Sequence, residues 1–122
     1  IRVSNRNNLE SCIFSKFDEK NINKKNYLDE INILASKHSS VTRSFGSSAL
    51  SFAWLASGKV DCLFANNLNK IQIACGELLI KEAGGYLTNL KYINAYDTQD
   101  DLLIGANPTL HKEILKKINK KF

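Results

Sequence analysis

The sequence predicts an α/β layered domain with a mixed, largely parallel sheet and helices on both faces. Short apolar runs rich in β-branched residues alternate along the chain with stretches whose apolar residues recur at helical spacing. Glycines or an Asn-Pro pair stand where the predicted helices end or begin. The predicted order is β, α, β, α, β, α, β, β, α. Strands that alternate with helices favour parallel pairing.

The first half of the chain contributes two predicted strands and one predicted helix, besides an opening segment that reads as a strand in progress. Residues 9–17 contain a compact, β-favouring run, and the opening "IRVSNR" also reads as a strand. Residues 27–37 show helical spacing of apolar residues, and residues 40–45 form a short strand. Each of these elements has an apolar side that can pack into a core.

The middle of the chain predicts two helices with a buried strand between them. Ser47 or Ser48 can cap a helix over 48–57, which Gly58 ends. Residues 60–65 are of the buried-strand type, and the helix over 71–83 follows them.

The last part of the chain contains two strands and the final helix. Gly84 and Gly85 stop the preceding helix, residues 86–90 form a short strand, and residues 94–101 form a surface loop. Residues 102–107 are a buried strand. Asn107 and Pro108 then make a cap and first-turn pair for the last helix.

Length and composition predict one globular domain over residues 1–122. The chain is 43% hydrophobic and 24% charged, and its apolar runs are too short to cross a bilayer. Cys12, Cys62 and Cys75 stand among apolar neighbours without CxxC spacing, so we expect reduced, buried thiols and a cytoplasmic protein. Because the chain has no methionine, we expect a fragment or a split gene product.

The net charge of +5 has a simple explanation in solvated helix faces. The lysines cluster near residues 20–25 and 116–121. Aromatic residues are not interleaved with them in the pattern that stacks nucleic-acid bases. A separate feature, the Gly46-Ser47-Ser48 turn, leaves free N–H groups at a helix start, which suits a phosphate or a sugar hydroxyl. Such a turn also serves as a plain helix cap, and both interpretations stay open.

Four motifs occur in a fixed order: "RSFGSSAL", "ASGKVDCLFA", "IACGELLIKEAGG" and "GANPTLHKEIL". Together they resemble the C-terminal half of the inositol monophosphatase family, including its bacterial extragenic suppressor members of the SuhB type. The resemblance runs from Arg43 to the end of the chain and more loosely back to "IRVS". It implies the C-terminal half of that family's fold. It also implies a family reaction of magnesium-dependent phosphomonoester hydrolysis.

The resemblance also implies a damaged site. Gly46, Ser47 and Ser48 stand where the family binds substrate, with Ser48 in place of the usual alanine. Gln72 stands at the aspartate that ligates magnesium in the family, and Ala65 stands at the glutamate that holds substrate hydroxyls. A neutral amide oxygen on a longer arm is a poor substitute for a carboxylate around Mg²⁺.

The remaining metal motifs of the family, which belong to its N-terminal half, do not occur in these 122 residues. The acidic clusters at 18–20, 29–30 and 97–101 lie in predicted loops or on a solvated helix face. His38 and His111 have no evident nucleophile partner. We therefore expect no catalytic residue, no bound magnesium and no hydrolysis by this chain alone.

Three roles remain open from the sequence. The chain can be the C-terminal domain of an inositol-monophosphatase-like hydrolase, in a homodimer or with a missing N-terminal half as its partner. It can be a non-catalytic protein of the suppressor type that acts with transcription or RNA machinery. It can also be a degenerate gene fragment. None of the three involves a membrane.

Overall fold

The computed structural model describes residues 1–18, 37, 41–44 and 46–119. Its centre is a five-stranded sheet in the order β2-β1-β3-β5-β4. The strands and helices have the following bounds: β1 Ile13–Asp18, β2 Val41–Arg43, α2 Ser48–Ala56, β3 Cys62–Asn66, α3 Lys70–Glu82, β4 Tyr86–Thr88, η1 Ala95–Asp97, β5 Leu102–Ala106 and α4 Pro108–Asn119.

The sheet is mixed, as the sequence predicts. Strand β1 pairs in parallel with β2 and with β3. Strand β5 lies antiparallel to both of its neighbours, β3 and β4. Four of the five strands therefore run in the same direction, and β5 is the one that runs against them.

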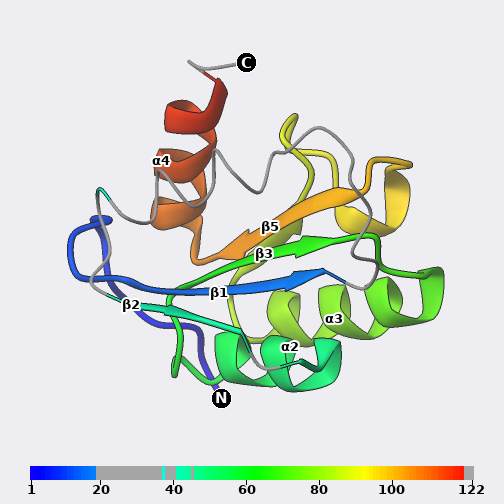
Figure 1. Cartoon of the computed structure of the whole chain (residues 1–122), viewed down its shortest axis with the longest axis horizontal. Coiled ribbons are helices and arrows are strands. Elements are labelled where there is room, and N and C mark those ends of the chain that lie inside the picture. Colours follow the sequence, from blue (N-terminus) through cyan, green and yellow to red (C-terminus); the bar gives the residue numbers. More distant parts are fainter. Residues whose placement is uncertain (19–36, 38–40, 45, 120–122) are drawn as a thin grey trace.

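Helices cover both faces of the sheet (Figure 1). Helices α2 and α3 lie side by side against one face, and α4 lies against the other. Both faces are covered because each is apolar: successive residues of strand β3 alternate between two apolar clusters, one on each face. Cys62 and Phe64 join the cluster that contains the apolar residues of α4, while Leu63 and Ala65 join the cluster of α2 and α3.

The helix boundaries follow the capping residues. The Ser47 Oγ accepts a hydrogen bond from the Leu50 N–H at the start of α2. Gly58, just past its end, has a φ of +76°, which glycine adopts at little cost. At α4 the Asn107 Oδ1 accepts from the Leu110 N–H over 2.9 Å. These three predicted helix ends are confirmed.

Some sequence predictions need correction. The opening residues 1–7 are not a strand; the Val3 N–H instead donates to the Ala83 carbonyl at the end of α3. Cys12 and Cys62 are buried, but Cys75 is exposed, because α3 carries apolar residues on its outward side too. The predicted helix over 27–37 and His38 lie outside the described residues, apart from Lys37. In the part of the chain that is described, no helix is long and apolar enough to cross a membrane.

Candidate functional site

Two helix starts meet at one end of the α2/α3 layer. Gly46 precedes α2 with a φ of +69° and lies exposed. The Ser47 side chain caps α2, so its oxygen is already engaged with a backbone N–H. This turn is folded as a helix cap, and the sequence-predicted substrate residues Gly46, Ser47 and Ser48 all lie in it.

Helix α3 begins with a reciprocal pair of hydrogen bonds. The Gln72 N–H donates to the Asn69 Oδ1 over 2.8 Å, and the Asn69 N–H donates to the Gln72 Oε1 over 3.0 Å. This is a capping box, which satisfies two backbone donors that a helix start otherwise leaves open. The amide oxygen of Gln72 is therefore held against its own helix.

The same side chain joins the two helices. The Gln72 Nε2 donates to the Ser48 Oγ over 2.9 Å. The structure thus brings together two sequence-predicted site residues that are 24 positions apart. The resemblance places both among the positions at which the chain departs from the family pattern. The sequence pattern does not reveal this contact, because it joins the starts of two separate helices.

Ala65 lies near the same end, on β3. Its side chain is buried in the cluster beneath α2 and α3, and it offers no polar group to a ligand. Asn67, which follows the strand, has a φ of +59°. The resemblance places a glycine at this position, and asparagine is one of the few other residues that tolerate this left-handed backbone.

The residues at this end do not fit a magnesium ion. Mg²⁺ takes oxygen ligands in near-ideal octahedral geometry, usually with one or two carboxylates. The first turn of α3 has no acidic residue, and the one amide oxygen at the family's ligand position accepts the Asn69 N–H. Within the described ranges, no three His, Cys, Asp or Glu side chains are grouped closely enough to hold a metal.

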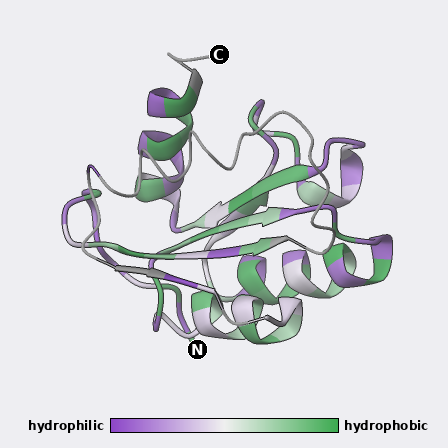
Figure 2. Cartoon of the chain, viewed as in Figure 1, coloured by the Kyte–Doolittle hydropathy of each residue, from purple (hydrophilic) through white to green (hydrophobic). Residues whose placement is uncertain are grey.

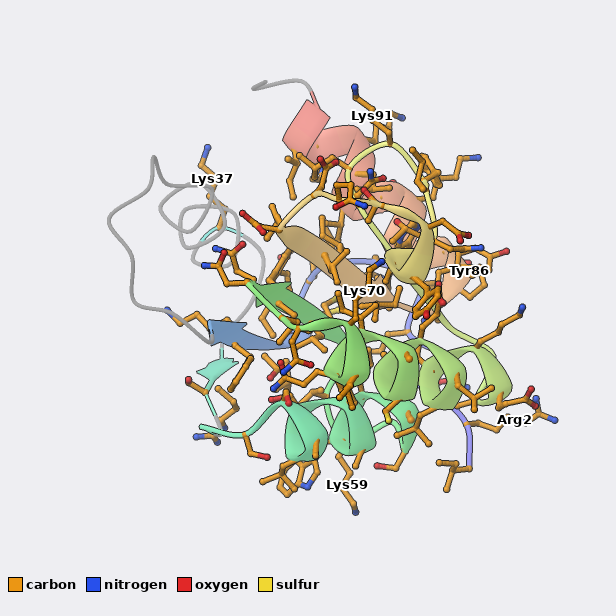
Figure 3. All side chains as sticks on the ribbon, turned by 90° about the vertical axis from the view of Figure 1, so that its right-hand side faces the viewer. Arg2, Lys37, Lys59, Lys70, Tyr86 and Lys91 are labelled. Atoms are coloured by element: carbon orange, nitrogen blue, oxygen red, sulfur yellow. The ribbon has the colours of Figure 1, made fainter. Side chains whose placement is uncertain are left out.

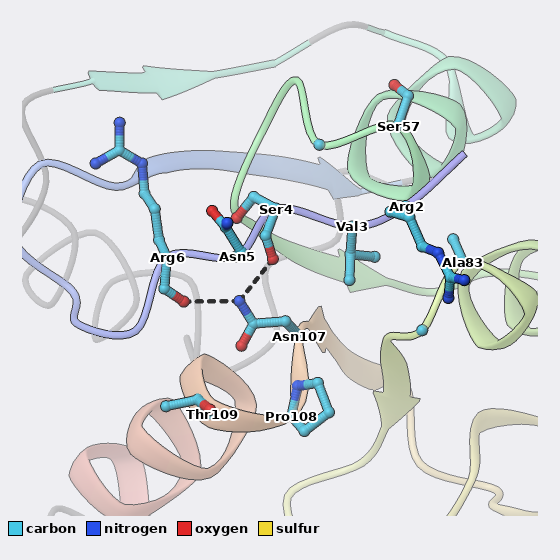
Figure 4. A pocket seen from close by; sticks show the side chains of 12 residues that line it. Arg2, Val3, Ser4, Asn5, Arg6, Ser57, Ala83, Asn107, Pro108 and Thr109 are labelled. Carbon is cyan, nitrogen blue, oxygen red and sulfur yellow. Dashed lines mark hydrogen bonds between the residues drawn. The ribbon is translucent and has the colours of Figure 1, made fainter.

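A pocket lies at the opposite end of α2 and α3, between their last residues and the start of α4 (Figure 4). Polar groups that line it form hydrogen bonds within the protein. The Asn107 Nδ2 donates to the Ser4 and Arg6 carbonyls over 2.8 and 2.7 Å. The Arg6 Nε lies 3.4 Å from the Asp61 Oδ2. The contacts around this pocket hold the N-terminal segment against the core. The pocket lies at the other end of the two helices from the Ser48–Gln72 contact.

Asp61, which stands in the motif "ASGKVDCLFA", is a buried carboxylate that the sequence pattern does not single out. It is 4% exposed, and its Oδ2 accepts the Ile13 N–H over 2.7 Å. The Asp61 N–H in turn donates to the Ile13 carbonyl. Asp61 therefore ties the start of β3 to the start of β1, a structural role far from the helix starts.

His111 lies on the inward side of α4 and is buried; among the described residues, its side chain hydrogen-bonds to Thr88 and contacts the rings of Tyr86 and Tyr92. Its Nε2 lies 2.6 Å from the Thr88 Oγ1, whose hydroxyl donates to the Asn89 carbonyl. The direction of the bond between Thr88 and His111 follows the tautomer of the neutral ring. The Nδ1 is buried without a hydrogen-bond partner, and burial lowers the pKa of His111 to about 4.

The fold defines the class of protein: a layered α/β domain with a mixed sheet and helices on both faces. The model of the inositol monophosphatase family matches residues 1–121, and the chain belongs to that family.

Several curated relatives resemble the chain. It is 33% identical over 92 residues to an inositol-1-monophosphatase of Caulobacter vibrioides, covering 75% of this chain and 36% of the relative. It is 31% identical over 122 residues to a fructose-1,6-bisphosphatase/inositol-1-monophosphatase of Thermotoga maritima, covering 98% and 44%. A Nus factor SuhB of Buchnera aphidicola is 36% identical over 111 residues, covering 91% and 39%.

Solved structures show the same fold. The extragenic suppressor protein suhB of Bartonella henselae superposes with a TM-score of 0.84 at 28% identity, over 99% of this chain and 46% of that one. The inositol monophosphatase of Anabaena superposes with a TM-score of 0.85 at 21% identity, over 98% and 50%. The chain thus spans half the length of these proteins or less.

Proposed function

We propose that this chain is the C-terminal half of an inositol-monophosphatase-type domain and that it does not hydrolyse phosphomonoesters by itself. One observation carries the proposal: Gln72, at the family's metal-ligand position, is hydrogen-bonded to both Asn69 and Ser48. An aspartate at this position would face the ions as a carboxylate. Here the side chain instead stabilises the start of α3 and its contact with α2.

The family's chemistry uses paired magnesium ions to activate water and to stabilise the leaving oxygen. In this chain we propose the Gly46–Ser48 turn as a residual substrate-side surface without metal ligands. Ala65, at the degenerate position, is buried and contributes no polar group to it. The proposed hydrolase therefore needs carboxylates that another part of the family domain supplies.

The test is phosphate release from inositol monophosphate by the unmodified chain, with and without Mg²⁺. We expect no turnover above the buffer rate. The double variant Gln72→Asp, Ala65→Glu should also fail, because one restored ligand does not assemble a two-metal site. Magnesium-dependent turnover that disappears in Ser47→Ala would contradict the proposal and would place a working site at this turn.

A second candidate is a non-catalytic role in transcription. The relative from Buchnera is named a Nus factor, and it matches 91% of this chain at 36% identity. A binding role of this kind does not depend on the missing carboxylates. It is tested by transcription elongation assays with and without the purified chain. No change in pausing or termination would count against it.

A further inference from the structure

The pocket between the ends of α2 and α3 and the start of α4 is lined by two positively charged residues and by no negatively charged one. Its volume is about 750 Å³, which lies within the range of small-molecule sites. Of the twelve described residues that line it, Arg2 and Arg6 are the charged ones. The pocket therefore favours an anionic ligand.

Arg2 brings a guanidinium group that the fold does not use. Among the described residues it has no hydrogen-bond or ion-pair partner, and it is exposed. In Figure 4 its side chain extends toward Ala83, and its Nη1 lies 4.0 Å from the place that a Cβ on Gly84 would take. The negative end of α3 favours a cation at this position. The planar donors of a guanidinium match a phosphate group.

Arg6 brings the second cation and is held from one side. Its Nε lies 3.4 Å from the Oδ2 of the buried Asp61, and 51% of the Arg6 side chain is exposed. The outer nitrogens of the guanidinium can therefore reach a ligand while Nε keeps its ion pair. Because Asp61 offsets part of the Arg6 charge, we expect Arg2 to contribute more to binding.

The first turn of α4, a helix with both hydrophobic and hydrophilic residues (Figure 2), adds neutral donors. A helix start leaves N–H groups without partners inside the helix. The Asn107 Oδ1 accepts the Leu110 N–H, and Pro108 has no N–H, so the exposed Thr109 offers the open N–H of this turn. The Ser4 Oγ in the pocket wall is buried and has no hydrogen-bond partner in the described part of the chain.

From this arrangement we propose that the pocket binds a small organic ligand with two phosphate groups, one at Arg2 and one at Arg6. Figure 4 shows the segment between the two arginines along one wall of the pocket, with their side chains on opposite sides of it. Two separated guanidinium groups suit two anionic groups better than one. The carbon skeleton of the ligand would contact the apolar part of the lining, which consists of Val3, Ala83 and Pro108.

The experiment is calorimetric titration of the unmodified chain with fructose 1,6-bisphosphate in the absence of Mg²⁺. The probes with a single phosphate are inositol monophosphate and inorganic phosphate. We expect one bisphosphate per chain, bound at least about tenfold more tightly than either single-phosphate probe, because only the bisphosphate engages both arginines. Added salt should weaken this binding, since both cations are exposed to solvent.

Arg2→Gln is the main variant, because Arg2 has no described partner whose loss would disturb the fold. It should weaken bisphosphate binding by at least about tenfold and leave Tm unchanged. Arg6→Gln should weaken binding less, and its Tm is measured as well, because it also loses the ion pair with Asp61. Lys91→Gln removes an exposed cation that Figure 3 shows well apart from Arg2, and this matched control should bind like the unmodified chain.

The absence of saturable binding would overturn the proposal, and so would equal affinity for the single-phosphate probes and the bisphosphate. Binding that Arg2→Gln leaves unchanged would also overturn it, because the ligand would then lie elsewhere, for example at the Gly46–Ser48 turn. The proposed function is judged by phosphate release, so neither result decides the other.

Discussion

Ser48 and Gln72, two residues of the candidate site, contact each other through their side chains. The Gln72 Nε2 to Ser48 Oγ hydrogen bond links the first turns of α2 and α3. A net contribution of about 0.5–1.5 kcal/mol is ordinary for such a bond. The Gln72 amide is thus part of the packing between the two helices.

His111 should make stability depend on pH. The pKa of His111 is lowered to about 4 in the folded chain, against about 6.5 in the unfolded chain. The unfolded chain therefore binds more protons between these values, and stability falls as the pH drops from about 6.5 toward 4. We expect a loss of about 2 kcal/mol between pH 7 and 4.5 in urea unfolding.

The control for this measurement is His111→Gln, which keeps a side chain that can hydrogen-bond to Thr88 but does not titrate in this range. Carboxylates contribute to acid sensitivity in both proteins, so the difference between them isolates His111. Equal losses of stability in the two proteins would contradict the assigned titration.

Asp61 should be one of the most sensitive polar positions. Its replacement by alanine leaves the Ile13 N–H without its acceptor and Arg6 without its ion pair. We expect Asp61→Ala to lower the free energy of unfolding by about 2 kcal/mol. Asp61→Asn retains an acceptor and should cost less. Glu82→Ala, at an exposed position, is the matched control for loss of a carboxylate, and equal effects would refute the structural role.

At the scale of elements, the contact between α2 and α3 depends on Gly76. Replacing a helix-interior glycine with alanine ordinarily stabilises a helix by about 1 kcal/mol. Here the new methyl group would lie 2.5 Å from carbons of the Phe52 ring. We expect Gly76→Ala to destabilise the chain by about 1–3 kcal/mol, as overpacking does. Thermal unfolding tests this, and an increase in Tm would show that the two helices are packed loosely.

The helix boundaries were predictable because their signals are local. Gly58 and Asn107 act on the turn in which they stand. The orientation of α3 was harder to predict, because it has two apolar sides and periodicity does not say which one faces the sheet. Cys75 was expected to be buried for this reason. The Ser48–Gln72 bond joins two separate helices and depends on their packing, which no spacing in the sequence reveals.

At the scale of the whole molecule, different helices cover the two faces of the sheet. The exposed side of α4 is charged, and α3 is charged as well, since Lys70, Lys81 and Glu82 are exposed. The candidate site lies on the α2/α3 face, where Gln72 contacts Ser48.

The most direct test of this account is calorimetric titration of the unmodified chain with Mg²⁺. Because Gln72 is engaged by Asn69 and Ser48 and its first turn has no carboxylate, we expect no saturable binding tighter than millimolar. Gln72→Asp alone should not create a tight site, since one carboxylate leaves most of the ion's octahedral shell to water. A stoichiometric, micromolar magnesium site on the unmodified chain would contradict the account.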